Sequence, residues 1–152
     1  MKTLYISLLF LIFSGCSGKN AFSNFDMDAH QQLSAQSFKR VKLMQGEEVI
    51  GTFSSIYLNE VYPKRYNKNE YFFVYVYFKD LEQNYTLKLN AKENIKIKEL
   101  YYENRFSNLV DQRSKWNRYY LVSFEEAGDN LNLNLFTQKK KIASIKYQKD
   151  TQ

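Results

Sequence analysis

One stretch of this sequence constrains the fold more than any other. Residues 70–80 read EYFFVYVYFKD, so eight consecutive aromatic or β-branched residues lie between charged ends. Successive residues of an extended strand point to opposite faces, and both faces of this segment are therefore apolar. Eight residues are too few for a membrane-spanning helix, whereas aromatic and β-branched residues suit packed strands. The stretch predicts the central strand of a β-domain, which the rest of the chain must cover.

Further short runs of this type follow, separated by polar turns. Apolar and polar residues alternate clearly in 85–90 and 131–136, which indicates antiparallel strands with one face in water. No segment after residue 36 has the apolar stripe of a helix of about ten residues, which argues against parallel βαβ units. The predicted strands cover residues 37–44, 48–59, 70–80, 85–90, 95–100, 118–124, 131–136 and 141–147. We predict an all-β fold, a single antiparallel β-sandwich of about seven or eight strands, with a barrel as the alternative.

The amino terminus has the layout of a secretory signal. Lys2 precedes an apolar run over residues 4–13, and small residues follow before Cys16, the only cysteine of the chain. The apolar run is too short for a stable transmembrane span. The sequence predicts that residues 1–15 are a cleaved signal peptide. With its only cysteine at this point, the mature domain would contain no disulfide.

The residues before Cys16 read Phe13-Ser14-Gly15, and this segment resembles the bacterial lipobox. The resemblance implies cleavage by a lipoprotein signal peptidase and attachment of lipid chains to Cys16. Several acyl chains would hold the protein firmly on a membrane. Ser17, rather than Asp, after the cysteine implies the outer membrane. The alternative is an ordinary signal peptide with an incidental cysteine.

The length of 152 residues leaves room for one domain with a real core. Residues 16–36 are polar and poor in aliphatic side chains, and they predict a tether containing one or two helical turns. The expected order is therefore a signal peptide over 1–15, the lipidated cysteine and tether over 16–36, a β-sandwich over 37–148 and a tail over 149–152.

A resemblance to immunoglobulin-like sandwiches rests on Tyr120 and Val122, which stand where that family has its corner tyrosine and second cysteine. The chain as a whole combines a lipobox with one aromatic-rich sandwich of Lys- and Asn-rich composition. In this it resembles the small lipoproteins of Campylobacter and its relatives, at least one of which has a variant immunoglobulin-like fold. The resemblance implies an envelope-anchored module, some of whose relatives are adhesin-like.

The sequence offers few groups for catalysis. His30 is the only histidine, lies in the predicted tether without a second metal-ligating residue beside it, and is expected to face solvent. The carboxylate pairs Glu47-Glu48 and Glu125-Glu126 are neighbours in sequence and would point to opposite faces of a strand. We therefore predict a protein that is not an enzyme, with no cofactor and no metal.

Basic residues give the chain a formal net charge of +6. Exported proteins seldom meet nucleic acid, so we do not expect a nucleic-acid partner despite the aromatic residues nearby. Attraction to an anionic envelope surface and plain solubility remain the two interpretations. The basic groups lie at Lys64-Arg65, Lys92, Lys96, Lys98, Arg113, Lys115, Arg118 and Lys139-Lys140-Lys141.

The candidate binding site is one face of the central strand, formed by Tyr71, Phe73, Tyr75 and Tyr77. An exposed row of rings on a rigid sheet would offer amphipathic contact area to a partner protein. The alternative is that the row belongs to a two-faced core, or that residues 101–116 cover it. The hypothesis extends the row by three further tyrosines, namely Tyr101, Tyr102 and Tyr119.

These observations predict a lipid-anchored protein of the outer membrane, on its periplasmic face or at the cell surface. The expected partners are the membrane, through the lipid, and an envelope or surface protein; the oligomeric state stays open. The expected function is a non-enzymatic protein-binding or adhesion module. An alternative is a structural component of an envelope-spanning machine, resembling the small sandwich lipoprotein of type VI secretion. A hydrolase is a third class that no residue suggests.

Overall fold

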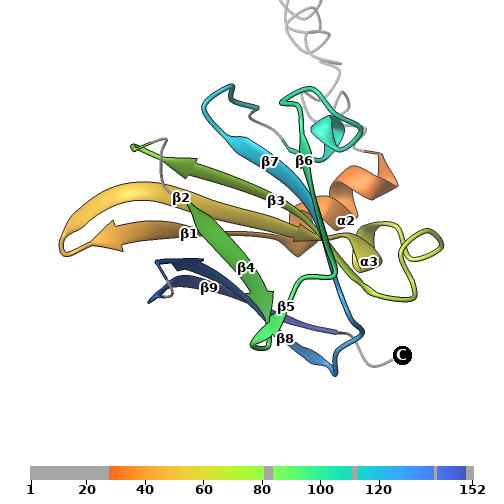
Figure 1. Cartoon of the computed structure of the whole chain (residues 1–152). Coiled ribbons are helices and arrows are strands. Elements are labelled where there is room, and N and C mark those ends of the chain that lie inside the picture. Colours follow the sequence, from red (N-terminus) through yellow and green to blue (C-terminus); the bar gives the residue numbers. More distant parts are fainter. Residues whose placement is uncertain (1–27, 81–83, 111–112, 139, 150–152) are drawn as a thin grey trace, which may run out of the picture.

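The computed structural model describes residues 28–80, 84–110, 113–138 and 140–149, and this part of the chain forms two antiparallel sheets (Figure 1). The first sheet has the order β1 (Phe38–Gln45), β2 (Glu48–Tyr57), β3 (Glu70–Phe78), β7 (Arg118–Phe124), β6 (Lys96–Leu100). The second has the order β5 (Lys92–Glu93), β4 (Tyr85–Leu89), β8 (Asn130–Thr137), β9 (Lys140–Gln148). The predicted all-β sandwich is confirmed, with β3 at the centre of the first sheet.

The strand prediction failed at the end of β2. The apolar pattern of residues 48–59 continues past Tyr57, but the chain turns there into the short helix α3 (Leu58–Val61). Leu58 and Val61 are both fully buried, and the amide of Tyr62 donates to the Leu58 carbonyl at 2.8 Å. A short apolar run suits a buried strand and a buried helical turn equally well, so periodicity could not separate them. The two-residue strand β5 was also not predicted.

A first core lies between the two sheets. Phe72, Val74 and Val76 of β3 point into it, and the alternating leucines of β8 meet them from the second sheet, each with no exposed surface. The alternation of residues 131–136 therefore has the predicted meaning, with leucines inside and asparagines outside. Those leucines are Leu131, Leu133 and Leu135.

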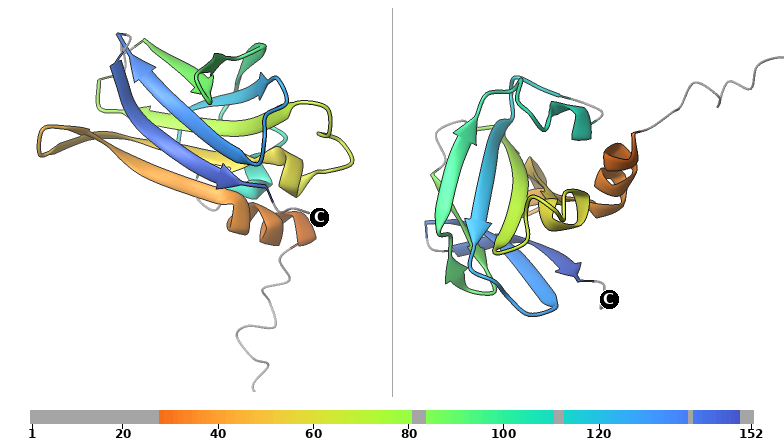
Figure 2. Two further views of the ribbon diagram at one scale, coloured as in Figure 1. Left: turned by 90° about the horizontal axis from the view of Figure 1, so that it is seen from below. Right: turned by 90° about the vertical axis from the view of Figure 1, so that its right-hand side faces the viewer.

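A second core lies on the opposite face of the first sheet. Phe73 and Tyr75 of β3 form it with Phe106 and Leu109, which come from the segment around the 3-10 helix η2 (Ser107–Leu109). Figure 2 shows α2, α3 and η2 on this side of the sheet, away from the second sheet. Both faces of β3 are thus buried, which explains why its sequence is apolar on both sides.

The helix α2 (Ala29–Ser37) extends the packed part of the chain back to residue 28. A capping box of Asp28 and Gln31 begins the helix, which is the helical turn expected in the tether. The hydroxyl of Ser34 is buried and donates to the Leu109 carbonyl at 2.7 Å, while that of Ser37 accepts from the Tyr57 amide at 3.0 Å. The remainder of the predicted tether, Cys16 and the predicted signal peptide lie outside the described residues.

His30 is half-buried on α2, so the expectation that it faces solvent is wrong. Its Nδ1 lies 2.9 Å from the Val61 carbonyl oxygen, and its ring packs against Tyr62 with centroids 4.5 Å apart. The nitrogen beside a carbonyl oxygen must carry the proton and donate it. His30 therefore connects α2 to α3.

Within the described residues, no helix is long and apolar enough to cross a membrane.

Candidate functional site

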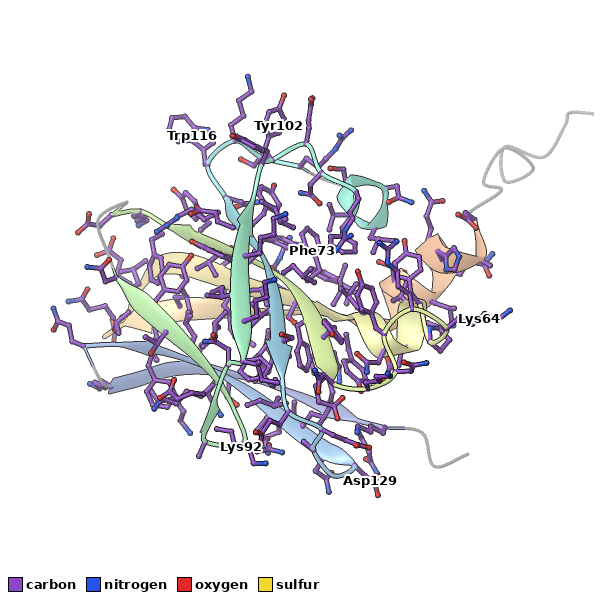
Figure 3. The ribbon with its side chains drawn as sticks, turned by 45° about the vertical axis from the view of Figure 1, so that its right-hand side comes forward. Lys64, Phe73, Lys92, Tyr102, Trp116 and Asp129 are labelled. Atoms are coloured by element: carbon purple, nitrogen blue, oxygen red, sulfur yellow. The ribbon has the colours of Figure 1, made fainter. Side chains whose placement is uncertain are left out.

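The four residues of the predicted binding row have different environments. Phe73 is completely buried and Tyr75 is 3% exposed, so the interpretation of the row as an open interface is wrong for these two rings. Figure 3 shows Phe73 inside the fold. Tyr71 and Tyr77, at the two ends of the row, are half-buried and keep some accessible surface. The alternative interpretation, in which residues 101–116 cover the row, describes its centre correctly.

The cover over the row is fixed by one aromatic ring. Phe106, in the segment that covers the row, packs on Phe73 with ring centroids 5.1 Å apart. The side chain of Asn104 accepts from the Phe106 amide at 2.9 Å and donates to the Tyr101 carbonyl at 2.8 Å, which shapes the turn. Because its inner side is anchored in this way, the segment presents Tyr101 outward, with 88% of its surface exposed.

The turn over residues 113–117 is fixed from below by a tyrosine of β7. The Tyr119 hydroxyl accepts from the Ser114 amide at 2.9 Å and donates to the Ser114 carbonyl at 3.0 Å. The side-chain amide of Asn117 also donates to this hydroxyl, at 3.3 Å. Tyr119 itself is buried, so it supports the site instead of contacting a partner. The turn that it holds carries Trp116, which is 68% exposed.

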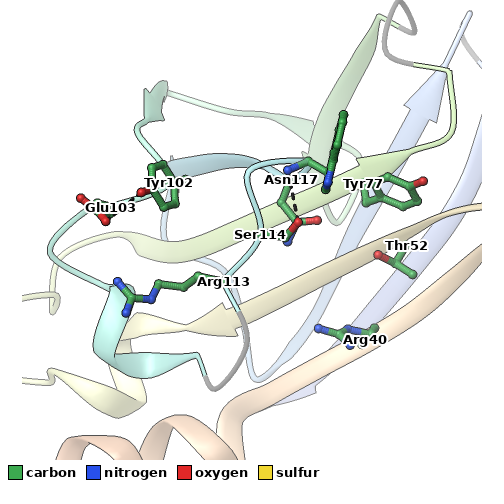
Figure 4. A pocket seen from close by; sticks show the side chains of 9 residues that line it. Arg40, Thr52, Tyr77, Tyr102, Glu103, Arg113, Ser114 and Asn117 are labelled. Atoms are coloured by element: carbon green, nitrogen blue, oxygen red, sulfur yellow. Dashed lines mark hydrogen bonds between the residues drawn. The ribbon is translucent and has the colours of Figure 1, made fainter.

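Between this turn and the first sheet lies an open groove of about 790 Å³, which we call the aromatic groove. In Figure 4, Tyr102, Glu103 and Arg113 lie along one side, and Tyr77, Thr52 and Arg40 along the other. Thr52 and Tyr77 are register partners on β2 and β3, which brings them to one face of the sheet. The full lining is Arg40, Thr52, Tyr77, Tyr102, Glu103, Arg113, Ser114, Trp116 and Asn117.

Arg40 is held in place on the sheet side of the groove. Its Nε donates to the Ser54 hydroxyl at 3.0 Å and its Nη2 to the Tyr75 hydroxyl at 3.3 Å. Its guanidinium lies 5.2 Å from the ring centroid of Phe38. Burial raises the pKa of Tyr75, and the hydrogen bond from Arg40 opposes that rise. Arg40 therefore presents a fixed positive charge beside the groove.

The opposite side of the groove carries a tyrosine bound to a carboxylate. The Tyr102 hydroxyl donates to Glu103 Oε1 at 2.8 Å, and this hydrogen bond raises the pKa of Tyr102. The ammonium of Lys115 lies 5.3 Å from the centroid of the Tyr102 ring. This side is therefore an amphipathic surface, with one ring flanked by both signs of charge.

The groups considered for catalysis lie in different parts of the fold. Among the described residues that line the aromatic groove, Glu103 is the only carboxylate, and His30 belongs to the contact between α2 and α3. Glu48 pairs with Lys79 at 2.7 Å and Glu125 with Lys92 at 3.3 Å, both at exposed positions. Among the residues that the structure describes, no three His, Cys, Asp or Glu side chains gather to hold a metal ion.

The sequence pointed to part of this groove only. Tyr77 was in the predicted row, and Tyr102 was an extension of it, whereas Arg40 and Thr52 were not considered. The signal that could have found them is strand register. Thr52 of β2 lies opposite Tyr77 of β3, and Arg40 of β1 lies opposite Ser54 of β2. That register depends on strand pairing, which the sequence does not specify by itself.

Comparisons with known proteins place the chain in no family. No family model matches the sequence, and no curated protein or solved structure matches it either.

Proposed function

We propose that this chain is a non-enzymatic protein-binding module, anchored to a bacterial outer membrane by lipid on Cys16, with the aromatic groove as its contact surface. The anchoring rests on the lipobox-like residues Phe13 to Cys16, which lie outside the described residues. The binding role rests on the groove. An adhesive role at the cell surface and a role between periplasmic proteins use the same contact surface.

The observation that carries the binding role is the gathering of exposed aromatic rings at one end of the molecule. Trp116 is 68% exposed and Tyr101 is 88% exposed. Tyr102, the neighbour of Tyr101 in sequence, lines the groove together with Trp116. Figure 3 shows Tyr102 and Trp116 at the outer end of the domain. Large aromatic side chains in water are unfavourable unless a partner covers them.

The chemistry of the groove agrees with a protein partner. Trp, Tyr and Arg are the side chains that most often dominate the free energy of protein association. The aromatic groove has Trp116, two tyrosines, and the guanidinium groups of Arg40 and Arg113. Their supports are rigid, because Tyr119 holds the turn from below and Arg40 is tied to β2 and β3. Pre-ordered side chains lose less conformational entropy on binding.

The relation to immunoglobulin-like sandwiches is part of the same proposal. It is supported by Tyr120 and Val122, which are both buried in the core between the two sheets, as the corner tyrosine and second cysteine of that family are.

A photo-crosslinking amino acid at position 101, the exposed neighbour of the groove residue Tyr102, tests the binding role in the native cell. The matched control carries the same amino acid at position 140, an exposed lysine of β9 outside the groove. We expect one discrete protein adduct from position 101, lost when Trp116→Ala is added, and no such adduct from position 140. Equal labelling from both positions, or labelling that survives Trp116→Ala, would reject the groove as the contact surface.

The anchoring is tested with Cys16→Ala and protease treatment of intact cells. We expect the wild-type chain in the outer-membrane fraction and the variant outside it. Digestion of the wild type on intact cells would favour adhesion, whereas protection until permeabilisation would favour a periplasmic partner. An adduct at position 101 that belongs to a multi-protein envelope complex would support the alternative of a structural machine component.

A further inference from the structure

A second groove forms on the same outer face of the first sheet, at the end away from Trp116. On β7, Ser123 lies opposite Tyr71 of β3 on one side and opposite Lys96 of β6 on the other. Leu121 lies opposite Lys98 in the same way. Side chains directly opposite each other in antiparallel strands share a face. Lys96 and Lys98 therefore project from the same face of the sheet as Tyr71.

Two loops add a cation each to this face. Arg65 follows α3, and Arg105 precedes Phe106 in the segment that covers Phe73. The guanidinium of Arg65 lies 5.8 Å from the Tyr66 ring centroid, and that of Arg105 lies 4.8 Å from the Phe106 ring centroid. With Lys96 and Lys98 they line an open groove of about 380 Å³, which we call the basic groove.

Within the described residues, the basic groove has no carboxylate to balance its positive charge. No described carboxylate lines the groove, and none of its four cations forms an ion pair with any residue that the structure describes. Other cations of the domain do have such partners: Lys88, for example, lies beside Glu93. Uncompensated cations that converge on one concave surface attract an anion, and arginine forks match phosphate or carboxylate geometry.

The floor of the groove is partly apolar. The ring of Tyr71 is half-buried and packs on Tyr66 with centroids 4.7 Å apart, and the half-buried Leu121 lies beside it on β7. Pockets for small ligands combine such apolar surface with a few converging polar groups. Apolar surface lined by cations suits a ring that carries charged substituents.

We propose that the basic groove binds a small saccharide that carries at least two phosphate groups. The ring of the sugar lies over Tyr71, and its phosphates meet Lys96 and Lys98 from one side and Arg65 and Arg105 from the other. The volume of the groove is near the lower end of the range for small-ligand pockets. This site is separate from the aromatic groove and does not depend on the function proposed for it.

Isothermal titration calorimetry of the full-length chain in detergent tests this proposal. The probes are glucose 1,6-bisphosphate, glucose, inorganic phosphate and a hexaglutamate peptide. The test variant is Lys96→Gln with Lys98→Gln, since both side chains are exposed and their loss should not disturb folding. The matched control is Lys140→Gln with Lys141→Gln, which removes the same charge from exposed positions of β9.

We expect the bisphosphate to bind more tightly than inorganic phosphate, and glucose not to bind. The test variant should weaken bisphosphate binding about tenfold or more, as the loss of two charge-assisted hydrogen bonds implies, while the control variant changes it less than about twofold. If both variants weaken bisphosphate binding equally, the effect comes from net charge and not from the groove, and the proposal is overturned. Tighter binding of hexaglutamate than of the bisphosphate would assign the groove to an acidic peptide instead, and no binding of the bisphosphate would also reject it.

Discussion

The Tyr119 hydroxyl is bonded twice to one residue, because it accepts from the Ser114 amide at 2.9 Å and donates to the Ser114 carbonyl at 3.0 Å. The Tyr119 ring is stacked on Phe73, with centroids 6.0 Å apart, in the second core. One side chain thus joins this core to the turn that carries Trp116. The shape of the aromatic groove therefore depends on the Tyr119 hydroxyl, although Tyr119 is buried and would not touch a bound protein.

Tyr119→Phe is expected to loosen this turn while the ring stays packed. The Ser114 amide and carbonyl lose their partner, so the amide should exchange its hydrogen faster and the free energy of unfolding should fall by about 1 kcal/mol. Amide hydrogen exchange measures the first effect, and fluorescence of Trp116, the only tryptophan, reports the turn. Tyr101→Phe changes an exposed ring and is the control. Unchanged exchange at Ser114 would show that the hydroxyl does not hold the turn.

The sheet architecture could be predicted because local patterns specify it. The two apolar faces of residues 70–80 and the alternation of residues 131–136 both depend on which side chains can be buried, and the structure confirms both. Gly46 has a φ of 61° in the turn between β1 and β2, a conformation that glycine tolerates. The end of β2 was not predictable, since Leu58 and Val61 are as apolar as a strand requires.

The site was predicted less well because it depends on what covers the central strand. A row of rings such as Phe73 and Tyr75 looks the same in sequence whether it binds a partner or a loop of its own chain. Among the described residues of the loop that covers it, Phe106 and Leu109 are buried in the second core and Val110 packs against them. The basic groove depends on pairing between β6 and β7, which no local pattern specifies.

Replacing Lys149 is expected to destabilise the fold more than its place near the end of the chain suggests. Its Nζ donates at 2.6 Å to Glu70, whose side chain is 1% exposed at the start of β3 and also accepts from the Tyr57 hydroxyl at 2.5 Å. Lys149→Met leaves the buried carboxylate without its cation. We expect the free energy of unfolding, measured by urea denaturation, to fall by about 2 kcal/mol.

The matched control for this ion pair is Glu48→Gln on the surface. Glu48 and Lys79 lie 2.7 Å apart, but their side chains are 68% and 55% exposed, so solvent screens them. The expected change in the free energy of unfolding is below about 1 kcal/mol. If Lys149→Met and Glu48→Gln lower the free energy of unfolding by the same small amount, solvent screens the ion pair of Glu70 as well. Burial would then not make this ion pair stronger than the surface pair.

Gly51 is required by a close approach of two strands. A Cβ atom at this position would stand 2.1 Å from the Tyr77 carbonyl oxygen of the neighbouring strand, which is backbone and cannot turn aside. We expect Gly51→Ala to lower the free energy of unfolding by about 2 kcal/mol or more and to displace Tyr77 in the aromatic groove. Gly128→Ala is the control, since nothing lies within 4 Å of its Cβ position. Thermal denaturation that ranks the two variants equally would contradict this explanation.

Ala91 is expected to be a position where glycine improves the protein. Asn90 and Ala91 connect β4 to β5 with φ values of 48° and 70°, the left-handed conformations of a two-residue hairpin turn. Asparagine tolerates this region, but alanine does not favour it. Ala91→Gly should raise the free energy of unfolding by about 0.5–1 kcal/mol in urea denaturation. The control is Ala143→Gly in the strand β9, which should lower the free energy of unfolding. If both substitutions lower it, Ala91 is unstrained.

The fold is expected to lose stability in alkaline solution because of buried tyrosines. Burial raises the pKa of Tyr57, Tyr85 and Tyr147 above the ordinary value of about 10, and the hydrogen bond to Glu70 raises that of Tyr57 further. The unfolded chain releases these protons at about pH 10, whereas the folded chain keeps them. The folded state therefore binds more protons above that pH, and the free energy of unfolding falls as the pH rises.

Below about pH 10 the three tyrosines contribute their full stabilisation. Above that pH, each of them makes the free energy of unfolding fall more steeply with rising pH. Urea denaturation at a series of pH values on both sides of that point measures the slope. Tyr57→Phe is the informative variant, because it lowers stability at neutral pH by removing the bond to Glu70 yet should flatten the alkaline slope by one proton. A slope unchanged in Tyr57→Phe would mean that Tyr57 ionises in the folded protein as readily as in the unfolded chain, against its burial beside a carboxylate.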